Sequence, residues 1–241
     1  MSGHSKWSTI KRQKAVTDSR RSAAFTKLAR LISVAARAGG GDPNMNFQLR
    51  LAIDKARAAN VPNDNIERAI QAGTGEGKEG QTKEVAYEGF GPGGVAVIVN
   101  AVTDNPNRTA AEIRTTFTKH HGTMGGQNSV AWMFELRGVI SIPSEALRAT
   151  DRQAVELAAI DAGASDVREE GDGVLVECPP DRLTGLRAAL DRLTGTKLAA
   201  DVELVAQNTV SIDEPTAQQL HELCDTLTDL PDVISLATNE A

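Results

Sequence analysis

The sequence predicts an α+β multidomain fold, on the strength of three observations. Up to about residue 73 apolar residues recur at helical spacing, and from Glu84 onward strand-like runs alternate with helices. Charge divides at the same place, because residues 1–83 carry 15 lysines and arginines against 7 acids and residues 84–241 carry 11 against 25. All eight aromatic residues fall at or before Phe134. These shifts indicate at least two physical units with different roles.

The first part of the chain is expected to hold a basic arm and three helices. Residues 1–19 are polar and lack a regular period, which is typical of an arm that becomes ordered against a partner. Residues 20–38 repeat apolar side chains every three or four positions, and the glycine-rich run 39–43 ends that helix. Further helices are expected from about residue 46 to 59 and from Asp64 onward. Three short helices make a small all-α domain.

From Glu84 the pattern changes to one of strands and helices. The expected strands lie near residues 85–90, 95–102, 130–136, 138–142, 166–169, 174–178, 201–205, 210–212 and 233–236, and the expected helices near 107–121, 151–162, 181–193 and 215–230. The elements from 138 to 205 follow the order β-α-β-β-α-β, which is that of a ferredoxin-like domain. The elements before and after them would complete a second, matching α+β unit.

Three domains are therefore expected. Residues 1–83 form the basic arm, the helical domain and a linker; residues 84–136 and 207–241 together form one α+β domain; and residues 137–206 form an inserted ferredoxin-like α+β domain. The predicted fold class is thus α+β multidomain, an N-terminal three-helix domain followed by two ferredoxin-like α+β domains, one inserted in the other. The simpler alternative is two consecutive α+β units without insertion.

Composition excludes several classes of protein. No apolar run exceeds about five residues, whereas a helix that spans a bilayer needs about 20. The basic amino terminus does not lead into an apolar signal core, so we expect a cytoplasmic protein. Cys178 and Cys224 stand 46 positions apart without a pairing pattern, which favours two buried thiols in a reducing compartment.

The strongest functional signal lies in the first thirty residues. They hold eight lysines and arginines against one acid, in a chain whose formal net charge is −6. Trp7 lies within this run beside Lys6 and offers a flat ring for stacking. Cations that follow a sugar–phosphate backbone, with an aromatic face for a base, are typical of nucleic-acid binding. The alternative is a solvated basic helix with Trp7 folded back against it.

The helix expected over residues 20–38 would carry four cations on a face other than its apolar stripe. They are Arg20, Lys27, Arg30 and Arg37, at spacings of 7, 3 and 7. We therefore expect a basic rail that points outward. The candidate nucleic-acid-binding residues, the cations toward phosphates and the tryptophan toward a base, are Lys6, Trp7, Lys11, Arg12, Lys14, Arg20, Arg21, Lys27, Arg30 and Arg37.

The residues do not assemble a catalytic or metal-binding constellation. His120 and His121 are adjacent, so their side chains would diverge on a helix. The run 73–78 is one residue short of a phosphate loop, lacks the serine or threonine after its lysine and follows a helix instead of a strand. Ser129 lacks the flanking glycines of a hydrolase nucleophile. We therefore expect a protein that is not an enzyme, with no catalytic residue, no cofactor and no metal.

Several motifs carry a resemblance. They are Gly3-His4-Ser5-Lys6-Trp7, Phe25-Thr26-Lys27-Leu28, Ala35-Ala36-Arg37-Ala38-Gly39-Gly40-Gly41-Asp42-Pro43, Leu49-Arg50, Asn65-Ile66-Glu67-Arg68-Ala69-Ile70, Tyr87-Glu88-Gly89-Phe90-Gly91-Pro92, Thr103-Asp104-Asn105 and Asn107-Arg108-Thr109. On these motifs the chain resembles the YebC/PmpR family over essentially its full length. The resemblance implies a three-domain regulator of gene expression, usually described as a DNA-binding transcriptional regulator. A mitochondrial relative is described instead as a translational activator of cytochrome c oxidase.

The chain departs from the pattern of that family at two places. The run Lys11-Arg12-Gln13-Lys14 lacks the histidine often found there, which costs little positive charge. Asn128 stands where the family tends to have glycine, before Ser129 and Val130. Asparagine is the residue next best able to adopt a positive φ, so we expect the backbone there to remain left-handed.

Together these features favour a non-enzymatic nucleic-acid-binding regulator, with DNA as its expected target. A ribosome-associated RNA-binding translation factor is the alternative in the same class. A protein-binding adaptor is a second class, in which the acidic α+β domains would dock a basic protein. A hydrolase or transferase has the least support. The residues leave the target sequence, the regulatory signal and the oligomeric state open.

The arm supplies a first testable prediction. Trp7→Ala is expected to weaken binding of looped RNA by about 1–3 kcal/mol, because stacking on an unpaired base is lost, and to change binding of a rigid duplex little. Titration of both probes by fluorescence anisotropy measures the difference. Equal losses on the two probes would show that Trp7 has only a structural role.

Overall fold

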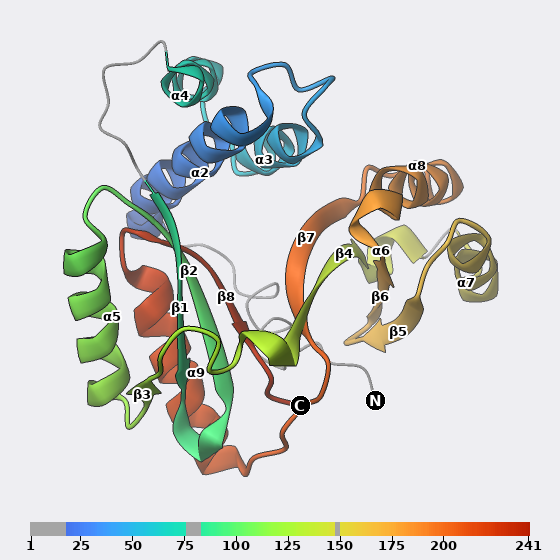
Figure 1. Cartoon of the computed structure of the whole chain (residues 1–241). Helices are drawn as coiled ribbons and strands as arrows, with labels where there is room; N and C mark the ends of the chain where they lie inside the picture. Colours follow the sequence, from blue (N-terminus) through green and yellow to red (C-terminus); the bar gives the residue numbers. More distant parts are fainter. Residues whose placement is uncertain (1–17, 76–82, 148–149) are drawn as a thin grey trace. The chain divides into compact units, whose positions relative to one another are not determined.

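The structure is a computed structural model that describes residues 18–75, 83–147 and 150–241, with side chains from residue 24 onward. Within these residues a helical region is followed by two four-stranded antiparallel sheets, each with its own helices (Figure 1). The predicted α+β fold class, with its N-terminal three-helix region, is therefore confirmed.

The described residues divide into two compact units. The first contains the residues up to Ala131 and Ser211–Thr238, and the second contains Trp132–Val210 and Asn239–Ala241. The chain leaves the first unit after Ala131, returns to it at Ser211 and ends in the second unit from Asn239, so most of the second unit is one segment between two parts of the first. The finer division into domains at residues 83, 136 and 207 remains a prediction.

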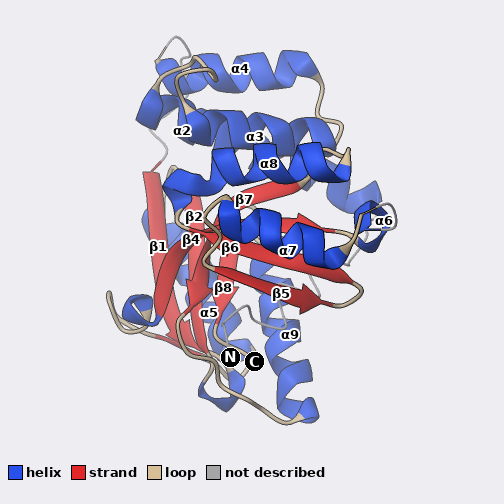
Figure 2. Cartoon of the chain, turned by 90° about the vertical axis from the view of Figure 1, so that its right-hand side faces the viewer, coloured by secondary structure: helices blue, strands red, loops and turns tan. Residues whose placement is uncertain are grey.

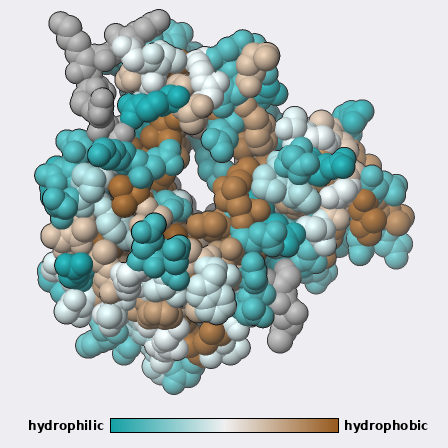
Figure 3. Space-filling view, viewed as in Figure 1, coloured by the Kyte–Doolittle hydropathy of each residue, from teal (hydrophilic) through white to brown (hydrophobic). Residues whose placement is uncertain are grey.

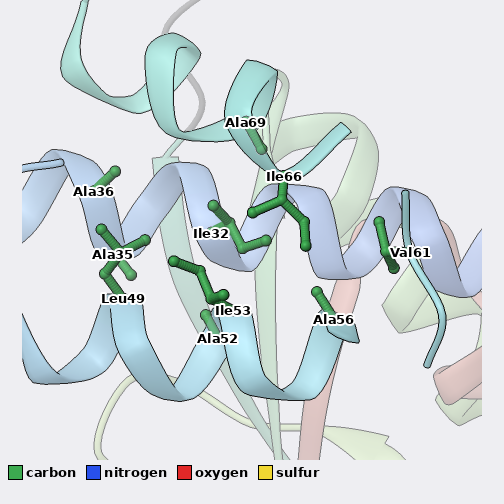
Figure 4. Close-up of a cluster of buried hydrophobic side chains, with 10 residues drawn as sticks. All are labelled: Ile32, Ala35, Ala36, Leu49, Ala52, Ile53, Ala56, Val61, Ile66 and Ala69. Atoms are coloured by element: carbon green, nitrogen blue, oxygen red, sulfur yellow. The ribbon is translucent and has the colours of Figure 1, made fainter. Parts of the chain in front are cut away.

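Three helices pack together in the first unit. They are α2 (Asp18–Gly39), α3 (Phe47–Ala58) and α4 (Asn63–Thr74). Their apolar stripes meet in one core, which Figure 4 shows in close-up and which consists of Ile32, Ala35, Ala36, Leu49, Ala52, Ile53, Ala56, Val61, Ile66 and Ala69. Six of these ten side chains are alanine or valine, so the helices approach closely around a small apolar volume. The helical periods in the sequence predicted the three inward faces correctly.

The turn between α2 and α3 is organised around Asn46, which is buried. Its Nδ2 donates to the carbonyl oxygens of Ala35 at 2.7 Å and Gly40 at 2.8 Å, and its Oδ1 accepts the N–H of Leu49 at 3.1 Å. One side chain therefore ends α2 and begins α3. A Cβ on Gly39 would lie 2.7 Å from Asn46 Nδ2, so glycine is needed there for space.

The first sheet has the order β3-β1-β2-β8. Its strands are β1 (Lys83–Phe90), β2 (Ala96–Thr103), β3 (Thr123–Met124) and β8 (Val233–Thr238). The hairpin β1–β2 is joined by the short helix η1 (Pro92–Gly94), in which Gly93 has a φ of 72°. Helices α5 (Pro106–Lys119) and α9 (Glu214–Asp229) cover one face and bury Ile113, Phe117, Leu220 and Leu223 (Figure 1).

The second sheet has the order β5-β6-β4-β7. Its strands are β4 (Phe134–Ile142), β5 (Asp166–Glu170), β6 (Gly173–Cys178) and β7 (Ala199–Ala206). Its helices are α6 (Ser144–Leu147), α7 (Arg152–Asp161), η3 (Pro180–Arg182) and α8 (Leu183–Thr194), and α7 and α8 lie across one face of the sheet (Figure 2). In chain order this is strand 2-3-1-4, the arrangement of a ferredoxin-like domain, as predicted.

The surface of α7 that points away from this sheet is partly apolar. Brown residues gather over α7 at the right of Figure 3, where Leu157 and Ile160 are exposed. Other brown residues lie near the middle of the view, and teal and white residues make up most of the rest of the face shown. No described helix is long and apolar enough to cross a membrane.

Three predicted strands differ from the observed ones. The strands expected at 130–136 and 138–142 are a single strand, β4, which follows a short helical turn, η2 (Ala131–Met133). The N–H groups of Val130 and Ala131 bond to the Glu88 carboxylate at 2.7 and 2.8 Å and so are lost to any strand ladder. The strand expected at 210–212 is only an isolated bridge between Val210 and Glu240.

The role of Asn46 can be tested by unfolding. Asn46→Ala removes a helix cap and leaves two buried carbonyl groups without their donor, so we expect a loss of about 2 kcal/mol in the free energy of unfolding. Asn44→Ala, the same change two residues away at an exposed position, is the control and should stay within about 0.5 kcal/mol. Urea titrations monitored by circular dichroism compare the two; similar losses would contradict the assignment.

Candidate nucleic-acid interface

Helix α2 carries the basic face that the sequence predicts to point outward. In the structure Lys27 Nζ instead donates to the carbonyl oxygen of Thr228. Arg30 Nη1 donates to Asp232 Oδ1 at 2.7 Å and to the carbonyl oxygen of Pro231 at 2.8 Å. The outward rail is therefore wrong for Lys27 and Arg30, which hold α2 against the connection between α9 and β8. Among the members of this face whose side chains are described, Arg37, in the last turn, is the exposed one.

Asp232 is the centre of this contact and is only 1% exposed. Besides Arg30, its carboxylate accepts hydrogen bonds from Arg108 Nη2 at 2.7 Å and from the hydroxyl group of Thr109 at 2.7 Å. The hydroxyl group of Thr103 donates to it at 3.1 Å. One buried carboxylate thus ties α2, the end of β2, the start of α5 and the start of β8 together.

The electrostatics of Asp232 follow from its partners. Burial alone raises the pKa of a carboxyl group, but the hydrogen bonds from Arg108, Thr109, Arg30 and Thr103 outweigh burial and hold the pKa of Asp232 at about 2. The same contact raises the pKa of Arg108. Burial, with a smaller effect of the Asp232 charge, raises the pKa of Tyr87. Asp232 is therefore ionised at neutral pH.

A second buried carboxylate, Glu88, organises the loop before η2. It accepts the backbone N–H groups of Asn128 and Val130, both at 2.7 Å, and of Ala131 at 2.8 Å. Burial raises its pKa, but these donors more than compensate, and the pKa of Glu88 lies below its ordinary value. Asn128 has a φ of 63°, which confirms the left-handed backbone predicted there. Glu88 is therefore structural.

The exposed arginines of the described helical region lie on all three helices, with Arg68 on α4 donating to the carbonyl oxygen of Asp64 at 3.2 Å and to the side chain of Asn65. Arg37 ends α2, and Arg50 and Arg57 stand seven residues apart on α3, which places them on one face. Arg50 also donates to the turn, from Nε to the carbonyl oxygen of Pro43 and from Nη2 to that of Asn44, both at 2.9 Å. The sequence predicts Arg50 and Arg57 on the outer face of α3, but the candidate nucleic-acid-binding residues did not include them.

The remaining predicted residues fall outside the described side chains. Arg20 and Arg21 lie in α2, in its part without described side chains. Lys6, Trp7, Lys11, Arg12 and Lys14 lie outside the described residues. Their contact with nucleic acid stays a prediction.

The described residues offer little for catalysis or metal binding. Among them, no group of three or more histidine, cysteine, aspartate or glutamate side chains is placed to hold a metal ion. The ring of His120 bonds to the Thr226 hydroxyl group at 3.1 Å, and both cysteines are buried and free. Burial is the main reason that the pKa of Cys178 rises to about 11, which keeps the thiol protonated and unreactive at neutral pH.

These features define the chain as a modular α+β protein. A three-helix region with exposed arginines is joined by a buried carboxylate to an antiparallel sheet with its helices, and a second such α+β unit follows in the sequence. The family models identify the chain further. Residues 5–76 match the TACO1/YebC protein N-terminal domain, and residues 82–240 match the TACO1/YebC second and third domain. The chain belongs to the TACO1/YebC family.

Individual relatives agree with this membership. A "Probable transcriptional regulatory protein" of Herpetosiphon aurantiacus is 49% identical over 240 residues, which cover 99% of this chain and 94% of that protein. A protein of the same name from Moorella thermoacetica is 49% identical, with 99% and 95% covered. The crystal structure of a conserved hypothetical protein from Aquifex aeolicus is 40% identical, covers 95% of this chain and 93% of its own, and superposes with a TM-score of 0.84.

The Asp232 contact generates a prediction on stability. Asp232→Asn should lower the free energy of unfolding by about 3 kcal/mol, because two arginines lose the charge that they surround. Asp104→Asn is the matched control: Asp104 pairs with the same Arg108 but is 64% exposed, so little change is expected.

The pH dependence has a definite sign. The pKa of Asp232 is depressed from 3.8 to about 2, so its contribution of about 2 kcal/mol is complete above about pH 4 and is lost as the pH falls toward 2. Unfolding measured between pH 7 and pH 2 should therefore show a smaller acid-induced loss in Asp232→Asn than in the natural chain. Parallel pH profiles would contradict the assignment.

Proposed function

We propose that this protein is a non-enzymatic, nucleic-acid-binding regulator of gene expression, with DNA as its target, acting in the cytoplasm. The observation that carries the proposal is the excess of eight positive charges on residues 1–83, with Arg37, Arg50 and Arg57 exposed on the helices. Phosphate is the usual partner of such a cluster on an otherwise acidic chain. The names of the relatives, which describe transcriptional regulatory proteins, support the same role.

In this proposal the cations have two kinds of role. The arm residues, with Arg20 and Arg21, and the exposed arginines of α2 and α3 contact phosphates. Lys27 and Arg30 position α2 through their bonds to Thr228 and Asp232. Contacts to phosphates fix the register of a protein on a duplex but carry little sequence information, so the binding should be only modestly sequence-specific.

The acidic remainder of the chain has a role in the same proposal, which is to repel phosphate. Residues 84–241 carry an excess of 14 negative charges, which repels phosphate from that part of the protein. The nucleic acid is thereby directed to the helical region. An adaptor role, in which these acids dock a basic protein, would need no nucleic acid at all, and the following experiment separates the two.

The salt dependence of binding tests the proposal. About six phosphate contacts should give a slope near −5 in a plot of log K against log salt concentration for duplex DNA. The double variant Arg37→Gln, Arg57→Gln should make the slope less negative by about 2. Arg114 is an exposed arginine of α5, and Arg114→Gln should leave the slope unchanged. A slope near zero would rule out the phosphate model. Tighter binding of structured RNA than of DNA at equal salt would move the assignment to RNA.

A further inference from the structure

The turn between α2 and α3 displays an apolar side chain to solvent. Met45 is 84% exposed, more than any other large hydrophobic side chain among the described residues. A single exposed apolar residue is ordinary on a protein surface and needs no function. The surroundings of Met45 are less ordinary, because several hydrogen bonds hold the backbone of the turn in place.

The bonds that fix this turn are numerous. The carbonyl oxygen of Asp42 accepts the N–H of Met45 at 3.1 Å and that of Asn46 at 2.9 Å, and its carboxylate accepts the N–H of Asn44 at 2.8 Å. Arg50 bonds to the carbonyl oxygens on the other side of the turn, and the buried Asn46 anchors its end. Met45 therefore projects from a preorganised backbone, which lowers the entropy lost when its side chain is bound.

Arg50 holds a cation against the same turn, through its bonds to the two residues that precede Met45. A guanidinium group has five N–H donors, and two of those of Arg50 are used on Pro43 and Asn44. The other three remain for an acceptor outside the chain. Arg50 is exposed, so a phosphate oxygen can reach it without any rearrangement of the turn.

We propose that this turn is a base-contacting site, in which Met45 packs against an unpaired or readily unstacked base while Arg50 binds the adjoining phosphate. The proposal rests on the proposed function and specifies the part of a nucleic acid that the helical region recognises. Methionine is among the apolar side chains that insert beside bases where stacking is weak. A protein partner is less suitable, because a stable protein interface needs about 800 Å² from each side and the turn offers one apolar side chain.

The site predicts a preference among nucleic acids. A fully paired, stiff duplex presents no open base face, so Met45 would contribute little to its binding. A duplex with one bulged nucleotide, or with flexible pyrimidine–purine steps, presents a base that Met45 can cover. The preference for the bulged form should therefore depend on Met45, and the general affinity should depend on the arginines.

The test uses the full chain and two DNA probes that differ only in one central bulged 2-aminopurine. Fluorescence anisotropy gives the affinity for each, and 2-aminopurine emission reports the surroundings of the base. Met45→Ala should weaken binding of the bulged probe about fivefold and abolish the emission change, with the paired probe unaffected. Met45→Leu should retain most of both effects, and Arg50→Gln should weaken both probes.

Leu157→Ala, at a residue of α7 that is 64% exposed, is the matched control and should change neither probe. Thermal unfolding of Met45→Ala should match that of the natural chain, because the side chain is exposed. Suppose that the natural chain binds both probes in a salt-dependent way, and that the ratio of the two affinities is the same for Met45→Ala as for the natural chain. The base contact is then overturned and the proposed function stands. If the natural chain binds neither probe, both fail.

Discussion

The contact on which the helical region depends is the buried carboxylate of Asp232 between Arg30 and Arg108. A carboxylate that is 1% exposed would be strongly destabilising without partners, and here two guanidinium groups and two hydroxyl groups surround it. Because Arg30 comes from α2 and the other donors come from β2 and α5, the contact fixes the helical region on the first sheet. The exposed arginines of α2 and α3 take their positions from it.

Asp232 and Glu88 are two of the buried carboxylates, and each is stabilised by a different kind of donor. Asp232 recruits side chains that are far apart in sequence, whereas Glu88 recruits three backbone N–H groups of one loop. The contacts of Asp232 join separate helices and strands. The contacts of Glu88 fix the shape of a loop that forms neither a strand nor a helix. Both depress a carboxyl pKa despite burial, so these two acids are part of the framework and do not belong to the acidic surface.

The sequence predicted whatever depends on local periodicity. The inward positions of Ile32, Leu49 and Ile66 follow from helical spacing, and the left-handed backbone at Asn128 follows from the conformational range of asparagine. The Asp232 contact was not predictable in this way, because Arg30 and Asp232 are 202 residues apart and no local pattern links them. The strand expected at 130–136 was shortened by a similarly remote partner, Glu88, which takes the N–H groups of Val130 and Ala131.

These remote contacts change how a basic face should be interpreted. Arg30 and Arg37 share one face of α2 by spacing, yet Arg30 is paired internally while Arg37 is exposed. Charge counted along the sequence therefore overstates the cations that can meet phosphate on α2 and overlooks those on α3. If about six phosphates are contacted, Arg37, Arg50 and Arg57 account for about half of them. In the proposed function the remaining contacts come from other cations, so Arg37, Arg50 and Arg57 should not suffice alone.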